Sequence, residues 1–237
     1  MNRVDEIFGT SPVLLPVVHP IGREAALAAV DVVREVGAPG VFLIDQGMIE
    51  RDVLALAREV RARHPSLWIG LNLLSRDPAE ALVVAIGACN ADVDGIWSDD
   101  AGVDDRGVRS RAEQFVTVRR RLGWRGLYFG GVAFKYQREI GRDDLGKVAA
   151  SAVPYVDVVC TSGPGTGMAA DVSKVAVMGE AIGPDHALAL ASGVTPENVR
   201  NFLPHTRAFL VGTGLESRLG VLDPAKIEAL LRALRGA

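Results

Sequence analysis

The sequence predicts an α/β chain folded as a single (β/α)8 barrel, the TIM-barrel class. Eight short apolar runs alternate with amphipathic helical patterns along the 237 residues. Near-continuous apolar strands are typical of parallel sheets that are covered by helices. The length also fits, because such barrels typically have about 250 residues. No linker or low-complexity tract divides the chain, so we expect one domain over residues 1–237, with residues 1–11 as a short segment before the first strand.

The expected strands are the eight apolar runs, which in chain order are Val13–Val18, Val41–Ile44, Leu67–Leu73, Gly95–Trp97, Gly126–Phe129, Val156–Cys160, Ala187–Ala191 and Ala208–Val211. The expected helices are the amphipathic stretches between and after them, Arg23–Val36, Glu50–Arg63, Pro78–Cys89, Ser110–Leu122, Asp143–Ala152, Asp171–Ile182 and Pro224–Arg235. A shorter helix is expected over Pro196–Phe202, because Thr195 is a good N-cap and Pro196 suits the first helical position. An open doubly wound sheet is the alternative, disfavoured because no Gly-x-Gly-x-x-Gly turn follows the first strand.

Composition excludes several classes of function. The formal net charge of −3 provides no general attraction for nucleic acid or for an anionic membrane surface. No apolar run reaches the roughly 18 residues that span a bilayer, and no signal peptide opens the chain. Two cysteines in apolar surroundings form no disulfide framework, so we expect a reducing, cytoplasmic location. No Cys/His set has zinc spacing, and we expect no cofactor; a divalent cation held by carboxylates and a homo-oligomer both stay open.

Two glycine-containing turns near the end of the sequence predict a phosphate site. They are Ala191-Ser-Gly-Val-Thr-Pro-Glu-Asn198 and Val211-Gly-Thr-Gly-Leu-Glu216, and each follows a predicted strand. Glycine lets backbone amides approach an anion closely, and helix starts are partly positive. Barrel enzymes often bind phosphate after the seventh and eighth strands. We therefore expect a small phosphorylated ligand to be held by Ser192, Gly193, Gly212, Thr213 and Gly214; the alternative is two ordinary strand–helix connections.

Polar residues at the ends of other strands predict the rest of the site, because the carboxyl ends of barrel strands form the catalytic mouth. Asp45 or Asp99 is the expected general base, and His19 is a general acid or base or else makes a structural hydrogen bond. Substrate contacts are expected from Asn72, Asp100, Thr161 and Ser162. The loop of glycines and hydroxyl residues that begins at Thr161 is expected to cover the ligand.

Lys135 ends the run Gly130-Gly-Val-Ala-Phe-Lys135 and is one of four lysines in the chain. A lysine at a strand end forms a Schiff base if its pKa is depressed, or stays charged and binds an anion. Nothing near it in the sequence lowers its pKa, so we expect it to stabilise a developing oxyanion. The alternative is a side chain that extends to solvent with its stem packed on neighbours.

Several motifs resemble the BtpA/SgcQ family. They are the strand ending in Lys135, the helix end Arg119–Leu122, and the segments Gly70-Leu-Asn-Leu-Leu74, Val156-Asp-Val-Val-Cys-Thr-Ser-Gly-Pro-Gly-Thr-Gly167, Ser192-Gly-Val-Thr-Pro-Glu-Asn198, Val211-Gly-Thr-Gly214 and Asp223-Pro-Ala225. The resemblance implies a barrel of the ribulose-phosphate-binding type, related in fold to phosphoribosylanthranilate isomerase. Members of that family are linked to photosystem I biogenesis or are encoded beside sugar-transport genes.

The sequence also departs from that family's pattern. His19 is followed by Pro20-Ile-Gly22 instead of Pro-Leu-Pro-Gly, and the family's Glu-Asn pair appears as Asp45-Gln46. Gly131 stands where the family has an acidic residue, and Tyr136 stands where it has histidine. We expect an enzyme acting on a small phosphorylated sugar or phosphoribosyl compound by acid/base chemistry, as an isomerase, a lyase or a glycosidic-bond-cleaving enzyme. The alternative, favoured by Gly131, is a non-catalytic phosphate-ligand-binding assembly or regulatory factor.

Overall fold

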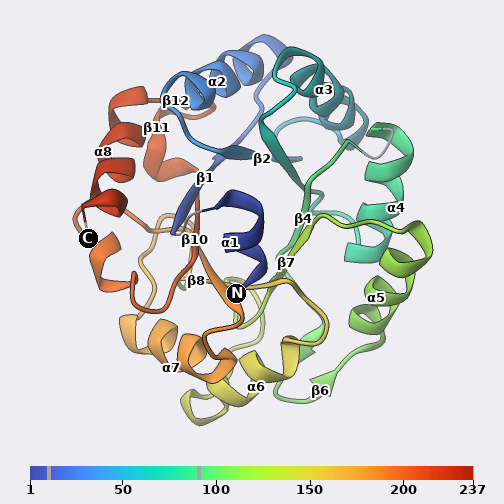
Figure 1. The fold of residues 1–237 in the computed structure, drawn as a ribbon, viewed down its shortest axis with the longest axis vertical. Coiled ribbons are helices and arrows are strands. Elements are labelled where there is room, and N and C mark those ends of the chain that lie inside the picture. Colours follow the sequence, from blue (N-terminus) through green and yellow to red (C-terminus); the bar gives the residue numbers. More distant parts are fainter. Residues whose placement is uncertain (10–11, 90–91, 237) are drawn as a thin grey trace.

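Eight parallel strands close into a barrel in the computed structural model, which describes residues 1–9, 12–89 and 92–236 (Figure 1). The strands are β1 (Val13–Val18), β2 (Gly40–Ile44), β3 (Trp68–Asn72), β4 (Gly95–Ser98), β7 (Leu127–Gly131), β8 (Val158–Ser162), β9 (Ala187–Ala191) and β10 (Ala208–Val211). Each pairs with the next in this order, and β1 pairs with β10 to close the barrel, with Leu15 opposite Leu210. The chain therefore has the (β/α)8 TIM-barrel fold that its alternating pattern predicts.

Helices surround the barrel, as Figure 1 shows. They are α1 (Arg3–Phe8), α2 (Arg23–Glu35), α3 (Glu50–Arg63), α4 (Pro78–Cys89), α5 (Ser110–Leu122), α6 (Leu145–Ala152), α7 (Val172–Ile182) and α8 (Pro224–Arg235). The first of them lies across one end of the barrel, where Phe8 packs on the ring of Trp68 at a centroid distance of 5.5 Å. Because Trp68 begins β3, this is the end that carries the amino termini of the strands. Of the predicted segment 1–11, residues 10 and 11 lie outside the described residues.

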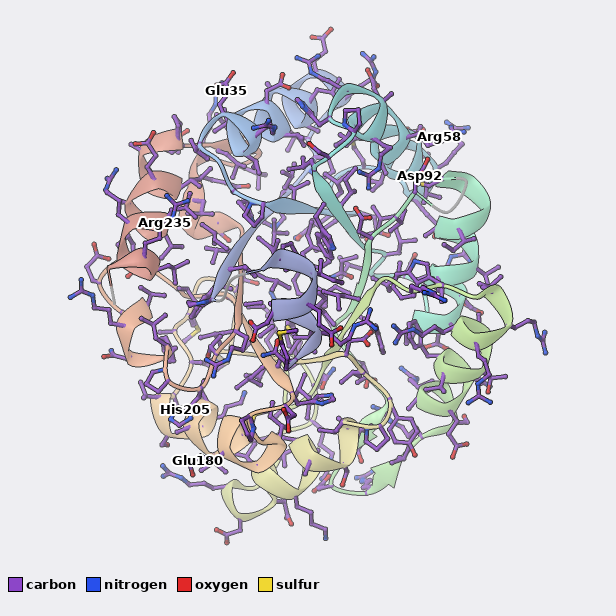
Figure 2. The ribbon with its side chains drawn as sticks, viewed as in Figure 1. Glu35, Arg58, Asp92, Glu180, His205 and Arg235 are labelled. Carbon is purple, nitrogen blue, oxygen red and sulfur yellow. The ribbon has the colours of Figure 1, made fainter. Side chains whose placement is uncertain are left out.

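Side chains fill the interior of the barrel, and the labelled charged residues lie at the periphery (Figure 2). The rings of Phe42, Trp68 and Phe129 meet edge-on, with centroids 5.2 Å apart for Phe42 and Phe129 and 6.1 Å apart for Trp68 and Phe129. Glycine on a neighbouring strand makes room for them, since a Cβ at Gly70 would lie 2.3 Å from the Phe42 ring. Edge-on aromatic packing of this kind stabilises a core beyond the apolar area it buries. A rigid interior of this kind fixes where each strand ends.

The structure corrects three predicted elements. The predicted helix over Pro196–Phe202 is only a 3₁₀ turn, η2 (Val199–Asn201), because the Asn198 side chain accepts a hydrogen bond from the Thr195 amide at 2.8 Å and closes a tighter turn. The predicted helix Asp143–Ala152 is α6 preceded by a 3₁₀ turn, η1 (Arg142–Asp144). Strand β7 ends at Gly131, four residues before Lys135.

Two short hairpins also follow strands of the barrel where the sequence pattern predicted only loops. One joins β5 (Val103–Asp104) to β6 (Gly107–Val108), and the other joins β11 (Glu216–Arg218) to β12 (Val221–Leu222). The second hairpin follows β10 by way of a 3₁₀ turn, η3 (Thr213–Leu215), and places its first residue beside the end of β1. Within residues 1–9, 12–89 and 92–236, no helix is long and apolar enough to cross a membrane.

Candidate active site

All five residues predicted to hold phosphate line one cavity of about 100 Å³ at the carboxyl ends of β1, β9 and β10. The structure adds residues from four other connections to the same walls. The lining residues include His19, Gln46, Trp97, Lys135, Thr166, Gly167, Ser192, Gly193, Val194, Gly212, Thr213 and Gly214. Segments that lie far apart in the sequence meet here because the eight strand ends form a ring. We call this space the turn cavity.

Backbone amides on the walls of the turn cavity are free to bind an anion. The amides of Gly193, Val194 and Gly212 donate to no acceptor among the described residues. Gly193 has φ +67°, a conformation that glycine adopts without strain, and Ser192 beside it has φ +75°. An unpaired amide that faces solvent or a ligand costs little, but one that is buried must find an acceptor. These turns therefore supply donors for an oxyanion.

Helix starts contribute less to this site than the sequence predicts. The turns after β9 and β10 lead into η2 and η3, which are 3₁₀ helices of three residues each, and not into α-helices. A helix dipole needs several aligned peptide units, so a single 3₁₀ turn adds little positive potential. The free amides and the Lys135 ammonium group, which lines the same cavity, are the sources of positive charge.

The two glycines at the centre of the turns are in close contact with other parts of the site. A Cβ at Gly193 would lie 2.1 Å from the carbonyl oxygen of Met168, and a Cβ at Gly212 would lie 2.5 Å from Cε1 of His19. The loop after β8 therefore packs directly on the turn after β9. The Ser192 hydroxyl joins the two, accepting from the Gly167 amide at 2.8 Å and donating to the Gly165 carbonyl at 3.1 Å.

His19 is oriented by a carboxylate that sequence reasoning missed. Its Nδ1 atom lies 2.9 Å from Oε1 of Glu216, the first residue of β11. The Glu216 side chain is only 3% exposed, and Oε1 also accepts from the Gly220 amide at 3.2 Å. A carboxylate facing Nδ1 places a proton there, which leaves Nε2 free for a ligand. In the sequence, Glu216 could be noticed only as a carboxylate directly after the second glycine turn. The hairpin that it begins is what brings it to His19.

Asp99, Asn72 and Lys135 form a second polar group beside the turn cavity. Asn72, which is buried, donates to Oδ1 of Asp99 at 3.1 Å. Burial raises the pKa of Asp99, while the Asn72 hydrogen bond and the positive charge of Lys135 pull it down. Asn72 and Asp99 line a neighbouring cavity of about 330 Å³. A carboxylate with a raised pKa beside a cation is a suitable proton acceptor near neutral pH.

Four predicted site residues are occupied by contacts that hold the loops together. Asp45 accepts from the Leu74 amide at 2.8 Å, and burial raises its pKa. Thr161 donates to the Ala133 carbonyl at 3.3 Å from a fully buried position. Asp100 accepts from the Gly102 amide and from Arg109 and Arg111. Ser162 accepts from the Lys135 amide at 2.8 Å. These four side chains position the loops instead of facing the turn cavity.

The loop that carries Lys135 has an unusual backbone. Ala133 has φ +48° and Tyr136 has φ +62°, and with Ser192 they are the non-glycine residues of the described chain that have positive φ. Such conformations are strained and concentrate at functional sites, where the surrounding contacts hold them. Here the Lys135 ammonium donates to Thr166 Oγ1 at 3.3 Å, and the Tyr136 hydroxyl lies 3.2 Å from the same oxygen. Thr166 thus connects the Lys135 loop to the loop after β8, which lines the turn cavity.

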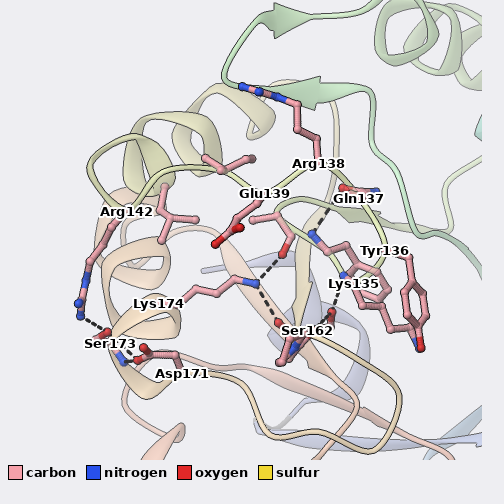
Figure 3. A pocket seen from close by; sticks show the side chains of 16 residues that line it. Lys135, Tyr136, Gln137, Arg138, Glu139, Arg142, Ser162, Asp171, Ser173 and Lys174 are labelled. Carbon is pink, nitrogen blue, oxygen red and sulfur yellow. Dashed lines mark hydrogen bonds between the residues drawn. The ribbon is translucent and has the colours of Figure 1, made fainter.

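A second lysine, Lys174, was not singled out by the sequence. It lies in the first turn of α7 and lines a cavity of about 540 Å³ between the loops that follow β7 and β8 (Figure 3). Burial lowers its pKa to about 8. Lys135 lines this cavity as well as the turn cavity. Among the residues that the structure describes, no group of three or more His, Cys, Asp or Glu side chains is arranged to hold a metal ion.

Comparison with known proteins agrees with this architecture. The sequence profile of the BtpA family matches residues 50–235. The chain belongs to the BtpA family. The segments that resemble the family therefore lie on a barrel with the family's fold. It is similar in structure to N-(5'-phosphoribosyl)anthranilate isomerase from Pyrococcus furiosus, with a TM-score of 0.67 and 14% identity over 95% of this chain and 100% of that chain.

One further structural similarity and one short sequence similarity are to enzymes of sugar phosphates or phosphoribosyl compounds by their names. The structure of 3-keto-L-gulonate-6-phosphate decarboxylase from Vibrio cholerae has a TM-score of 0.67 and 14% identity, covering 96% of this BtpA-family chain and 99% of that chain. In sequence, 65 residues are 43% identical to N-(5'-phosphoribosyl)anthranilate isomerase from Pyrobaculum islandicum. That match spans only 27% of each protein. At these identities the solved structures establish the fold alone, a (β/α)8 barrel.

Proposed function

We propose that this BtpA-family barrel is an enzyme that acts on a small phosphorylated sugar or phosphoribosyl compound by acid/base chemistry. The observation that supports this most is the composition of the turn cavity. Its walls combine unpaired amides from two glycine turns with His19 and Lys135, so an anion site and two groups suited to proton transfer or charge stabilisation share one space. Anion binding alone would need only the amides.

In this proposal each group has one role. The amides of Gly193 and Gly212 bind the phosphate, and Lys135 stabilises negative charge that develops on a substrate oxygen. Asp99 is the base that removes a proton from the carbon next to a carbonyl group, since its raised pKa favours proton acceptance. His19, held by Glu216, delivers or accepts a proton through Nε2. If the proton is removed from one carbon of the substrate and returned to the neighbouring carbon, the reaction is an isomerisation. If an adjacent bond of the substrate is cleaved instead, the same site is that of a lyase or a glycosidic-bond-cleaving enzyme.

The substrate must move a loop to enter. Ligand pockets typically have about 300–1,000 Å³, whereas the turn cavity has about 100 Å³. The segment Gly165–Gly167 covers it and is attached by the Ser192 hydroxyl. Opening this segment would join the turn cavity to the space beside Lys135, which is large enough for the sugar portion.

A non-catalytic ligand-binding or regulatory role is the second candidate. It is supported by the engagement of Asp45 and Asp100 in loop contacts and by Gly131, where the family has an acidic residue. A side chain at Gly131 has no room here, because its Cβ would lie 1.9 Å from the carbonyl oxygen of Asp99. The backbone that follows β4 approaches too closely. This packing weakens the case that Gly131 marks a lost activity.

A ligand panel followed by a turnover assay tests the proposal. Thermal stability is measured with ribulose 5-phosphate, ribose 5-phosphate and other pentose and hexose phosphates, with each dephosphorylated sugar as a matched control. We expect phosphorylated compounds alone to raise the melting temperature, because the amides recognise the phosphate. Each hit is then followed by NMR in deuterated water, where a carbon-bound deuteron reports proton abstraction. Binding without deuterium incorporation or product formation would favour the regulatory role, and no phosphate-dependent shift would refute both.

A further inference from the structure

Lys174 is placed unlike the other lysines of the chain. Figure 3 shows its side chain extending from α7 into the space between the loops that follow β7 and β8, with its Nζ atom at two backbone carbonyls. Nζ donates to the Ala133 oxygen at 2.5 Å and to the Ser162 oxygen at 2.8 Å. Lys147, in contrast, lies on the exposed surface, and Lys226, also exposed, donates to one carbonyl, that of Glu216. Exposed lysines keep a protein soluble, but a lysine held in a cavity wall by neutral acceptors does not serve that purpose.

The Lys174 amine is held by carbonyl oxygens and not by an ion pair. No carboxylate of the described residues lies within salt-bridge distance of it, and its hydrogen-bond acceptors are neutral carbonyls. Burial lowers its pKa to about 8, against the negative charge of the nearby Asp171, which raises it. Cys160 itself stays uncharged, because burial raises the pKa of its thiol. The charged residues on the cavity wall besides Lys174 are Lys135, Arg138, Glu139, Arg142 and Asp171. A desolvated lysine amine is the usual nucleophile for carbonyl compounds.

We propose that Lys174 is a reactive amine that forms an imine with a small aldehyde or ketone bound in the cavity of about 540 Å³ beside it. The neutral Nζ attacks the carbonyl carbon, and the two protons of the amine pass in turn through solvent to the carbonyl oxygen. That oxygen leaves as water, so one amine and one carbonyl compound become one imine and one water. No oxidant, reductant or metal is required, and the reaction is reversible by the same steps.

The cavity also indicates which carbonyl compounds fit. Its volume lies within the range of small-molecule sites, and two cationic side chains, Lys135 and Arg142, line it without a carboxylate partner among the described residues. Arg138 is different, because its guanidinium is paired with Asp105. We therefore infer a carbonyl compound that carries a phosphate or carboxylate group. This inference does not depend on the function proposed for the turn cavity, although Lys135 borders both spaces.

The test uses pyridoxal 5'-phosphate, an aldehyde with a phosphate group, trapped by borohydride at pH 7.5. Because the chain has only four lysines, mass spectrometry of peptides can quantify the label at each. At that pH about a quarter of an amine with a pKa of 8 is neutral, against about one in a thousand for an ordinary lysine. After allowance for partial shielding, we expect Lys174 to be labelled at least about tenfold faster than the exposed Lys147.

Two variants and a pH series complete the experiment. Lys174→Arg keeps a donor for the two carbonyls but has no nucleophilic amine, and should lose the fast label; Lys147→Arg should keep it. The labelling rate at Lys174 should level off above about pH 8, whereas the rate at Lys147 should continue to rise. Labelling of Lys174 at or below the rate of Lys147 in the unmodified protein would overturn the proposal, and so would fast labelling that persists in Lys174→Arg.

Discussion

Nδ1 of His19 lies 2.9 Å from Oε1 of Glu216, which joins the end of the first barrel strand to the hairpin after the last one. The contact crosses the seam where β1 and β10 close the barrel, and it is almost fully buried. Oε2 of Glu216 is buried without a hydrogen-bond partner among the described residues. Burying a carboxylate oxygen without a hydrogen-bond partner lowers the stability of the fold. A carboxylate in this position is explained if it orients another group, and here that group is the imidazole that borders the turn cavity.

Glu216→Gln should lower turnover about ten- to hundredfold, the usual cost of losing a carboxylate that orients a histidine. The amide has the same shape, so the fold and the KM for a phosphorylated substrate should change little while kcat falls. The measurement is steady-state kinetics on a substrate found in the ligand panel. Glu228→Gln is the matched control, because Glu228 pairs only with the exposed Arg232. An unchanged kcat and pH profile in Glu216→Gln would show that the pair is structural.

Gly193→Ala should weaken binding of phosphate esters at least about tenfold. The added Cβ would lie 2.1 Å from the Met168 oxygen, and alanine is strained at φ +67°, so the covering loop and the turn must both shift. We expect the free energy of unfolding to fall by about 1–2 kcal/mol. Calorimetric titration and chemical denaturation measure the two effects. Gly87→Ala is the control, since Gly87 lies within α4 with open space around it; equal affinity in the two variants would remove Gly193 from the site.

Lys135→Met should reduce activity by about a hundredfold or more, the scale expected when one preorganised charge is removed. Lys135→Arg should restore part of it, because a guanidinium places its charge differently. Lys147→Met, at an exposed position, should behave as the unmodified protein. The same series also tests the mechanism, since borohydride trapping with an aldehyde is expected at Lys174 and not at Lys135. Full activity in Lys135→Met would leave Lys135 as a surface residue.

Asp99→Asn should stabilise the protein at neutral pH even as it removes the proposed base. Because burial raises the folded-state pKa of Asp99, the folded protein binds the proton more tightly than the unfolded chain does. The contribution of Asp99 to stability is therefore present at low pH, below its ordinary value of 3.8, and is lost as the pH rises through the raised folded-state value. Melting temperatures measured from pH 3 to pH 8 should separate in favour of Asp99→Asn as the pH rises. Coinciding curves, or a less stable variant at pH 7, would contradict this account.

The barrel explains which of the predicted site residues lie together, whereas the partners of their side chains did not follow from the sequence. Ser192, Gly193, Gly212, Thr213 and Gly214 line one cavity, because parallel strands bring their carboxyl ends to one face whatever lies between them. The role of these residues in phosphate binding stays a prediction. Asp100 appeared equivalent to Asp99 in the sequence, yet it pairs with two arginines that enter from the following helix and its preceding loop.

The sequence by itself determined the alternation of strands and helices, hence the barrel and the ring of strand ends, because the period of apolar residues depends on local geometry alone. Only the tertiary structure decided that Glu216 holds His19, 197 positions away, and that Lys174 is desolvated against the Ala133 carbonyl. Both contacts depend on packing, which brings groups far apart in the sequence within hydrogen-bond distance and removes them from water. A local pattern of residues encodes neither the partner nor the loss of water.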